Sequence, residues 1–416
     1  MVPAIIEAAL LAPMQHLAID AALALLTLCG VAFYLIAAWS DRDFGRQNEP
    51  KLALASMPPV SILKPLKGAD SQTYAALRSH CEQEYGNYET LFGVNDASDE
   101  AIPLVRKLMV EFPNRELTLV VCTEVFGSNR KVSNLIHLLR QAKYGHILVN
   151  DGDIKVAPRY LQAVMANFDD PEIGMVTCLY RGNPAHTLGS RMEALGIATD
   201  FAPGVLTARF LDNGLRFGLG STLAMSRAVL EKIGGFHAVV DYLADDYQLG
   251  KRIAHAGFKV ALSHEVVETS VPAYSFRQFW EHQLRWARTM RVSRPSGYAG
   301  VGLTFGLPWA IFLVAVASGS WWSWTLLAAA LLARLAVAYS IGTGTLQDWQ
   351  VLRDLWLLPL RDLLAVAIWL CSYGGDTVTW RGEKFRLKQG RMYPLSPAPG
   401  SDIVKPGPKV HSQTQR

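Results

Sequence analysis

The run of residues 21–39 contains no charged side chain. It is long enough to cross a hydrocarbon core of about 30 Å as a helix. Residues 1–20 contain no Lys or Arg, so they lack the basic region with which a cleaved signal peptide begins. Basic residues such as Arg42 and Arg46 follow the run, and this bias predicts that the chain beyond it is cytoplasmic. We therefore expect a non-cytoplasmic segment at 1–20, a transmembrane anchor at 21–39 and a cytoplasmic domain at 40–272.

Within 40–272 the chain alternates short β-rich runs with helical patterns. This rhythm is typical of an α/β domain in which crossover helices connect a mostly parallel sheet. Such a sheet binds its ligand where the strands end. Strands are expected at 60–63, 90–94, 117–122, 146–150 and 174–177, and helices at 75–81, 101–112, 132–142 and 158–167.

Beyond residue 272 the composition changes. Residues 273–298 interleave aromatic residues with Arg, a pattern typical of a helix in the membrane interface. We expect a C-terminal membrane region at 299–380 and a basic, partly disordered tail at 381–416.

The membrane region at 299–380 contains three apolar stretches. Two read as spans joined by a turn at Gly319, and Arg334 in the second is expected to snorkel toward the cytoplasmic face. The third is short for a span, and we interpret it as re-entrant or interfacial rather than as a full crossing. These stretches are 301–317, 321–341 and 363–373.

Composition narrows the function classes. The 416 residues can hold one domain of about 250 residues and roughly 100 residues of membrane helix. The net charge is only +4 and Lys and Arg form no long block, which argues against nucleic-acid binding. The five cysteines include no CxxC pair, so we interpret them as reduced packing residues rather than zinc ligands or disulfides.

Polar residues follow the predicted strands. Lys64 follows the first strand, Asp96 the second, and Asp151 and Asp153 the fourth. A lone Asp such as Asp96 is more often a helix N-cap than a ligand. Asp151 and Asp153 are separated only by Gly152, so they repel each other unless one is protonated or a cation lies between them. Oxygen ligands without His or Cys favour Mg²⁺ or Mn²⁺, and a nucleoside diphosphate would complete the coordination.

Asp245 and Asp246 form another acidic pair further along the chain. By themselves they are equally consistent with an acidic helix start, which the helix dipole stabilises. A carboxylate at a strand-end crevice is also suited to take a proton from an attacking hydroxyl.

Taken together and in this order, the motifs resemble a known family. The chain is similar to inverting, membrane-bound family 2 glycosyltransferases of the ceramide glucosyltransferase type, whose bacterial relatives include hopanoid-biosynthesis glycosyltransferases. The resemblance covers roughly residues 58–390. The motifs that carry it are SILKPLKG at 61–68, GVND at 93–96, NRKVSNL at 129–135, DGD at 151–153, LADDY at 243–247 and HQLRW at 282–286.

The resemblance implies a GT-A type nucleotide-sugar-binding domain flanked by transmembrane and interfacial helices. It implies that Asp96 binds the uridine of a UDP-sugar, that Lys131 lies near its diphosphate, and that Asp151 contacts its sugar or ribose. Lys64 is expected in the same donor site. Asp153 would hold the Mg²⁺ or Mn²⁺ ion.

The same resemblance implies catalytic roles beyond the donor site. Asp246 would be the general base, Arg285 would meet the departing diphosphate, and Trp286 would line the acceptor site. His282 departs from the family motif, which usually begins with Gln or Arg. Asp245 stands where relatives often have Glu, which keeps the charge.

Several functions stay open at this point. The main expectation is a hexosyltransferase that moves one sugar from UDP-glucose to ceramide, in the bacterial inner membrane, as a multi-pass protein with a cytoplasmic catalytic domain. A hopanoid N-acetylglucosaminyltransferase is the alternative, since the sequence does not decide the lipid acceptor or the sugar. A polyprenyl-phosphate or polysaccharide-type transferase and a non-catalytic membrane scaffold are further alternatives; the intact acidic motifs argue against the scaffold.

Overall fold

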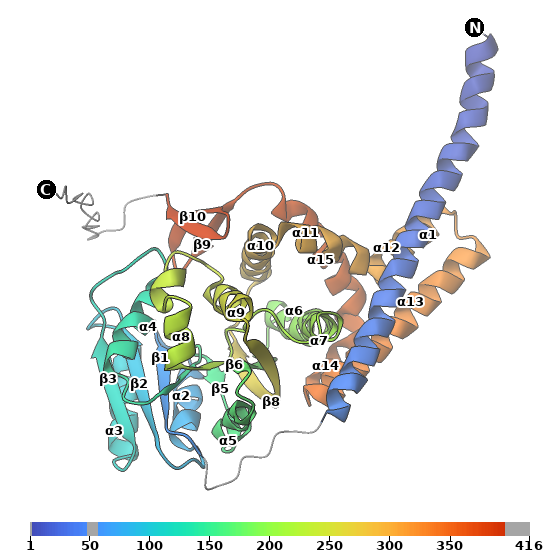
Figure 1. Ribbon diagram of the computed structural model, residues 1–416. Helices are drawn as coiled ribbons and strands as arrows, with labels where there is room; N and C mark the ends of the chain where they lie inside the picture. The colour runs from blue at the N-terminus through green and yellow to red at the C-terminus, as the bar shows by residue number, and fades with distance from the viewer. Residues whose placement is uncertain (1, 48–56, 396–416) are drawn as a thin grey trace, which may run out of the picture.

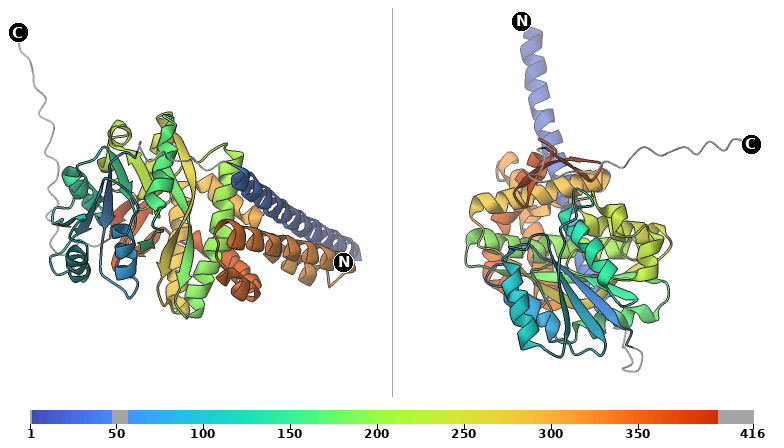
Figure 2. Two further views of the ribbon diagram at one scale, coloured as in Figure 1. Left: turned by 90° about the horizontal axis from the view of Figure 1, so that it is seen from below. Right: turned by 90° about the vertical axis from the view of Figure 1, so that its left-hand side faces the viewer.

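The computed structural model describes residues 2–47 and 57–395. A sheet-bearing body lies to one side of a helical membrane region (Figure 1). Helix α1 (Val2–Arg46) runs away from the body beside α13 (Trp321–Tyr339), as the left view of Figure 2 shows. The C-terminal part of α1 packs on α7 (Ala202–Leu211) and α12 (Gly306–Val316), so the anchor is part of the folded protein.

The body is built on an eight-stranded sheet with the order β3-β2-β1-β4-β7-β6-β8-β5. The strands β3, β2, β1 and β4 are parallel, β7 is antiparallel to both β4 and β6, and β6 is parallel to β8. The mostly parallel α/β fold predicted from the sequence is confirmed. The bounds are β1 Val60–Pro65, β2 Tyr88–Val94, β3 Glu116–Val121, β4 His146–Val149, β5 Ile154–Lys155, β6 Ile173–Pro184, β7 Leu223–Ser226 and β8 Lys259–Val271.

Helices cover the sheet and connect its strands. Every residue of β1 and β2 is buried, as expected for central strands with helices on both faces. The connecting helices are α2 Thr73–Cys81, α3 Ala101–Glu111, α4 Arg130–Gln141, α5 Tyr160–Met165, α6 Leu188–Gly196, α8 Arg227–Lys232 and α9 Asp245–His255. Shorter turns are the 3₁₀ helices Ala166–Asp169 and Phe236–Val239 and the π-helix η3 (Ile197–Phe201).

Helix α10 (Phe276–Ser293) occupies the segment predicted to lie in the membrane interface. It begins with a capping box in which Ser275 and Gln278 exchange side-chain and backbone hydrogen bonds, which fixes its start. It packs between α6 of the body and α15 (Leu358–Ser372) of the membrane region. Its side chains therefore face both parts of the protein.

Three stretches within the described residues are long and apolar enough to cross a membrane: Leu17–Arg46, Trp321–Thr345 and Gln350–Ser372. The last contains residues 363–372 of the apolar segment 363–373, which the sequence suggested was too short to span. It includes α14 (Gln350–Asp354), a 3₁₀ turn (Leu355–Leu357) and α15, while Trp321–Thr345 combines α13 with the π-helix Ser340–Thr345.

The segment expected to span at 301–317 contains a bend. Here α11 (Pro295–Gly300) and the 3₁₀ turn Val301–Thr304 meet α12 at an angle of 54°. The bend lies where Gly306 packs on Gly30 of α1: a Cβ added to Gly30 would stand 2.1 Å from the Cα of Gly306. This backbone contact fixes the start of α12 on the anchor.

Residues 377–394 form a three-stranded antiparallel sheet, which the sequence analysis did not predict; the disorder in the basic tail was expected only beyond residue 394. The strands are β9 Thr377–Trp380, β10 Glu383–Lys388 and β11 Arg391–Pro394. Each hairpin turns on two residues with positive φ, Arg381-Gly382 (51° and 86°) and Gln389-Gly390 (50° and 79°). Such pairs match the twist of antiparallel strands and favour Gly at the second position. Residues 396–416 lie outside the described residues.

Arg334 does not snorkel. Its side chain is 2% exposed, and its Nε and Nη2 atoms lie 2.9 and 2.7 Å from the two carboxylate oxygens of Asp362 on α15. It also pairs with Asp200 and donates to the backbone oxygen of Thr199, both on η3. Arg361 lies 3.2 Å from the second oxygen of Asp200. These four groups (Arg334, Asp362, Asp200 and Arg361) are called the buried charge network below.

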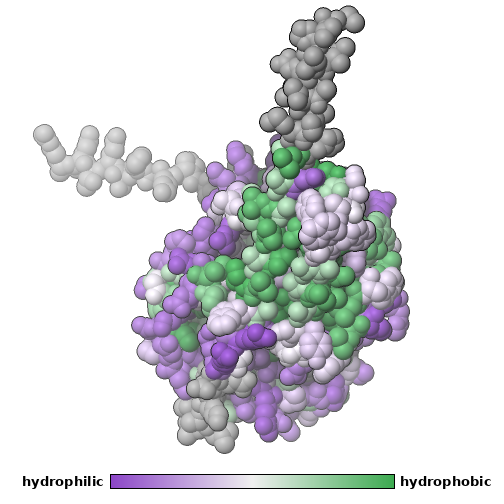
Figure 3. All heavy atoms as spheres, turned by 90° about the vertical axis from the view of Figure 1, so that its right-hand side faces the viewer, coloured by the Kyte–Doolittle hydropathy of each residue, from purple (hydrophilic) through white to green (hydrophobic). Residues whose placement is uncertain are grey.

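An apolar surface covers the membrane region on the side away from the sheet. In Figure 3 hydrophobic side chains gather over this face, while polar ones dominate the body around it. Exposed large side chains of the membrane region include Leu35, Trp39, Trp321, Trp324, Leu332, Trp349, Trp356 and Leu360. Contiguous apolar area of this kind indicates contact with lipid.

The buried charge network predicts that Arg334→Leu is strongly destabilising. Asp362 would remain buried without its counter-charge, which costs about 3–5 kcal/mol. We expect a clear fall in the melting temperature of the detergent-solubilised protein, measured by intrinsic fluorescence. Arg106→Leu, at an exposed site on α3, is the control and should change stability by less than about 0.5 kcal/mol. A further Asp362→Leu change should restore part of the loss, and equal melting temperatures for the two single variants would contradict the role of the network.

Candidate active site

Two acidic pairs far apart in the sequence meet at Gly220. Asp151 and Asp153 follow β4, and Asp245 and Asp246 begin α9. A Cβ placed on Gly220 would lie 3.2 Å from an oxygen of Asp151 and 3.2 Å from an oxygen of Asp246. The two carboxylates therefore converge on one small space, which any larger residue at 220 would crowd.

Lys131 holds the two pairs together. Its Nζ atom lies 2.8 Å from Oδ1 of Asp151 and 3.2 Å from Oδ2 of Asp245. Asn129 fixes the start of α4 by accepting a hydrogen bond from the backbone of Val132, which aims Lys131 inward. Burial disfavours the charge of Lys131, but Asp151 and Asp245 outweigh it and raise its pKa well above the ordinary value. Lys131 is therefore a permanent cation at the centre of the cluster.

Lys64 lies beneath this cluster at the end of β1. It is completely buried, and its Nζ donates to the backbone oxygen of Asp151 at 2.7 Å. Burial lowers its pKa to about 7, against the opposing effect of Asp153 and Asp151. The contact orients the loop that carries both carboxylates, so Lys64 supports the predicted donor site from behind.

Asp153 is the residue predicted to hold a cation. Its Oδ2 accepts a hydrogen bond from the hydroxyl of Thr269 at 2.7 Å. Burial raises its pKa, and the nearby carboxylate of Asp151 raises it further. A divalent cation would reverse this by favouring the charged form. The described residues contain no group of three or more His, Cys, Asp or Glu side chains arranged around a metal, so a cation here would take its other ligands from a substrate or water.

Asp246 has the environment of a general base. It is partly buried, and its Oδ1 accepts a hydrogen bond from the backbone of Tyr247 at 2.7 Å. Desolvation and the carboxylate of Asp245 together raise the pKa of Asp246 to about 6, against the opposing effect of Lys131. A carboxylate with this pKa can accept a proton near neutral pH and release it afterwards.

Asp96 lies outside the acidic cluster. It is exposed in the loop after β2, where its Oδ1 accepts hydrogen bonds from the backbone N–H and the hydroxyl of Ser98, both at 2.8 Å. These bonds lower its pKa. Asp96 therefore stays ionised in a local turn at the carboxyl end of the sheet.

Arg285 and Trp286 project from α10. The ring of Trp286 lies 6.1 Å from that of Phe201 and 5.7 Å from that of His282. Burial lowers the pKa of Arg285. Its guanidinium makes no hydrogen bond or salt bridge to any residue within 2–47 or 57–395. A partly buried cation without a salt-bridged carboxylate is suited to receive an anion.

The chain matches the sequence profile of Glycosyl transferase family 21 over residues 22–393. It belongs to this family. It is 25% identical over 353 residues to Ceramide glucosyltransferase 1 of Caenorhabditis elegans, a match that covers 80% of this chain and 73% of the relative. It is 28% identical over 235 residues to Ceramide glucosyltransferase 3 of the same organism, covering 56% of this chain and 51% of the relative, about half its length. The resemblance to ceramide glucosyltransferases drawn from the motifs is confirmed.

A solved structure shares the fold of this family 21 chain. It is the mannosyltransferase PcManGT from Pyrobaculum calidifontis, in complex with GDP-Man and Mn²⁺. The match has a TM-score of 0.54 at 20% identity and covers 86% of this chain and 98% of the other. The GT-A type fold expected from the sequence is thereby confirmed.

Sequence reasoning missed Glu193, which fixes α10 from the side of the body. It is buried on α6, with Oε2 accepting from Gln283 at 2.7 Å and Oε1 lying 3.3 Å from Nδ1 of His282. Burial would raise its pKa, but the contacts with His282 and Gln283 outweigh this and lower it. An acid inside an apolar helix is the signal that would have revealed it.

The raised pKa of Asp246 can be tested directly. The infrared carbonyl band of its protonated form should titrate with a midpoint near pH 6, because burial disfavours the carboxylate. Asp246→Asn should remove this component, while Asp212→Asn, at an exposed site after α7, should leave it unchanged. A midpoint near 4, typical of an exposed Asp, would contradict the environment described here.

Proposed function

We propose that this protein is an inverting glycosyltransferase that moves a single sugar from a UDP-sugar to the hydroxyl of a membrane lipid. The observation that carries the proposal is the convergence of Asp246 and Asp151 at Gly220, beneath a helix that also packs on the membrane region. An amphiphile at the membrane surface can then present its hydroxyl to Asp246. Membership of family 21 and the ceramide glucosyltransferase relatives favour glucose as the sugar and ceramide as the lipid.

The reaction assigns a step to each group. The acceptor oxygen attacks the anomeric carbon while its proton passes to Asp246, and the bond from that carbon to the diphosphate oxygen breaks on the opposite face. Attack opposite the leaving group inverts the anomeric centre. Arg285 meets the charge that develops on the departing UDP, and Trp286 forms a wall against the acceptor. Asp151 and Lys131 position the donor sugar and diphosphate, and Asp96 binds the uridine.

Mg²⁺ or Mn²⁺ bound at Asp153 would neutralise charge on the diphosphate. The neighbouring carboxylates of Asp151 and Asp153 fit such an ion, since a cation relieves their mutual repulsion. The mannosyltransferase of the same fold was solved with Mn²⁺.

The proposal is tested with purified protein, Mn²⁺ and a matrix of donors and lipids. UDP-glucose or UDP-N-acetylglucosamine is combined with ceramide or a hopanoid polyol, and products are identified by mass spectrometry. We expect glucosylceramide of inverted configuration, and no transfer in excess chelator. If sugar is transferred to the hopanoid alone, the acceptor is a hopanoid and not ceramide. If sugar is transferred to no lipid, the proposed function is refuted.

Variants connect this activity to the site. Asp246→Asn keeps the shape but removes the base, so kcat should fall by about 10² to 10⁴ with UDP affinity little changed. Asp212→Asn is the matched control and should retain full activity.

We further propose that the protein resides in the bacterial inner membrane with the sheet-bearing body in the cytoplasm. The absence of Lys and Arg in 1–20 and the basic residues after the first anchor support this orientation. A cysteine introduced as Ser71→Cys, at an exposed site, should react with an impermeant reagent only in permeabilised cells. The background carries Cys371→Ser to remove an exposed native thiol. Labelling in intact cells would reverse the orientation.

A further inference from the structure

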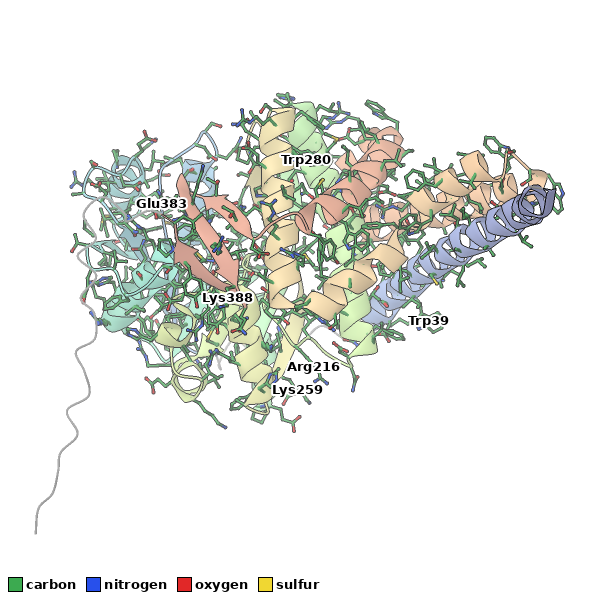
Figure 4. The ribbon with its side chains drawn as sticks, turned by 90° about the horizontal axis from the view of Figure 1, so that it is seen from above. Trp39, Arg216, Lys259, Trp280, Glu383 and Lys388 are labelled. Atoms are coloured by element: carbon green, nitrogen blue, oxygen red, sulfur yellow. The ribbon has the colours of Figure 1, made fainter. Side chains whose placement is uncertain are left out.

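The C-terminal sheet β9–β11 is attached to the loops of the active site. Lys67, in the loop after β1, donates from Nζ to the backbone oxygen of Arg381 at 3.3 Å. Arg130, the first residue of α4, lies 3.1 Å from the carboxylate of Glu383. Figure 4 shows Glu383 and Lys388 at the two ends of β10, which lies beside α10. The turn between β9 and β10 is therefore held next to the loops that end β1 and begin α4.

The other hairpin end is attached just before the catalytic pair. The backbone N–H of Met392 donates to the oxygen of Asp241 at 2.7 Å, and that of Leu243 lies 3.5 Å from the oxygen of Gly390. Leu243 also packs in a small core with side chains of all three strands, namely Val378, Phe385, Leu387 and Met392. Arg288 and Arg291 of α10 add contacts to Thr377 and Asp376 at the start of the sheet. The sheet thus has a fixed position relative to Asp246 and α10.

This attachment brings Arg381 to the acidic cluster. Its guanidinium lies over the ring of Trp380, 5.1 Å from the centroid, and interacts electrostatically with Asp151, Asp153 and Asp245. It makes no hydrogen bond or salt bridge through its side chain within the described part of the chain. The residue is open to solvent on one side, yet enough protein surrounds it that desolvation lowers its pKa.

Arg381 and Arg285 are two neighbouring cations. Arg381 is close enough to disfavour the charge of Arg285, and no carboxylate among the described residues forms a salt bridge with either side chain. Two like charges in this arrangement repel, and a ligand with several negative charges between them would remove the cost. The planar fork of Arg matches phosphate oxygens, which makes a diphosphate the fitting partner.

We propose that Arg381 binds the diphosphate of the donor together with Arg285, so that the C-terminal sheet forms one wall of the donor site. This inference rests on the proposed function, because it assumes a nucleoside diphosphate donor. It adds a residue from the basic tail, to which the sequence analysis assigned no role. It also assigns a role to the sheet, which holds the guanidinium of Arg381 in the donor site from the turn between β9 and β10.

The test compares the binding of UDP and UMP, with Mn²⁺ present, to the full-length protein in detergent by calorimetry. Arg381→Gln should weaken UDP binding by about 10- to 100-fold, the usual loss for one charge-assisted phosphate contact, and UMP binding much less. Arg381→Lys keeps the charge without the fork and should fall between. Lys388→Gln makes the same charge change at an exposed site on β10 and should bind UDP like the unaltered protein.

The outcomes separate this inference from the function itself. If the unaltered protein binds UDP and Arg381→Gln binds it equally well, the role of Arg381 is overturned and the function stands. Equal losses for UDP and UMP would also overturn it, because they would mean that the sheet acts only by holding its neighbours in place. If the unaltered protein binds no UDP, both proposals fail. Melting temperatures of the variants, expected to equal that of Lys388→Gln, exclude misfolding as the cause of a loss.

Discussion

The ion pairs of the buried Arg334 guanidinium are the interactions on which the arrangement of the sheet-bearing body and the membrane region depends. A charge at 2% exposure is tolerated only where carboxylates and backbone oxygens surround it. Its partners come from different places, Asp362 from the membrane region and Asp200 from the π-helix of the body. Membrane helices and sugar-binding domain can therefore satisfy this charge only when they are docked. The π-helix matters because its wider turn is a common way to redirect a side chain at a functional site.

From this junction the contacts lead toward the proposed catalytic residues. Arg361 pairs with Asp200 and lies 3.3 Å from Gln283 of α10, and Gln283 in turn donates to Glu193. Arg285 lies two residues after Gln283 on the same helix. The angle of α10, and with it the placement of Arg285 and Trp286, is thus set by polar contacts from both parts. Asp245 and Asp246 show the same dependence on surroundings: Asp245 is buried and salt-bridged to Lys131, while Asp246 is partly buried and meets Asp151 at Gly220.

The sequence predicted the parallel strands and the order of the acidic motifs, because strand periodicity is local and the carboxyl ends of parallel strands meet at one edge. It failed where long-range contacts decide. The snorkelling expected of Arg334 ignored Asp362, which arrives from another helix. The apolar pattern at 301–317 did not reveal the bend, which lies where Gly306 contacts α1. The hairpins at 381–390 were missed although Arg-Gly and Gln-Gly are turn pairs, because basic composition was weighed above alternation. The roles of Asp96 and Asp153, like those of the other site residues, stay predictions from the motifs.

The contact between Gly30 and Gly306 has a consequence for how the N-terminal helix can vary. A Cβ on either glycine would clash with the backbone of the other helix, so the backbones of α1 and α12 touch at this point with no side chain between them. Helix α1 is therefore an integral part of the fold, and its sequence is constrained at Gly30. An unrelated apolar helix of equal length would hold the protein in a bilayer, yet it would force α12 outward and take with it the segment that leads from α10 into the membrane.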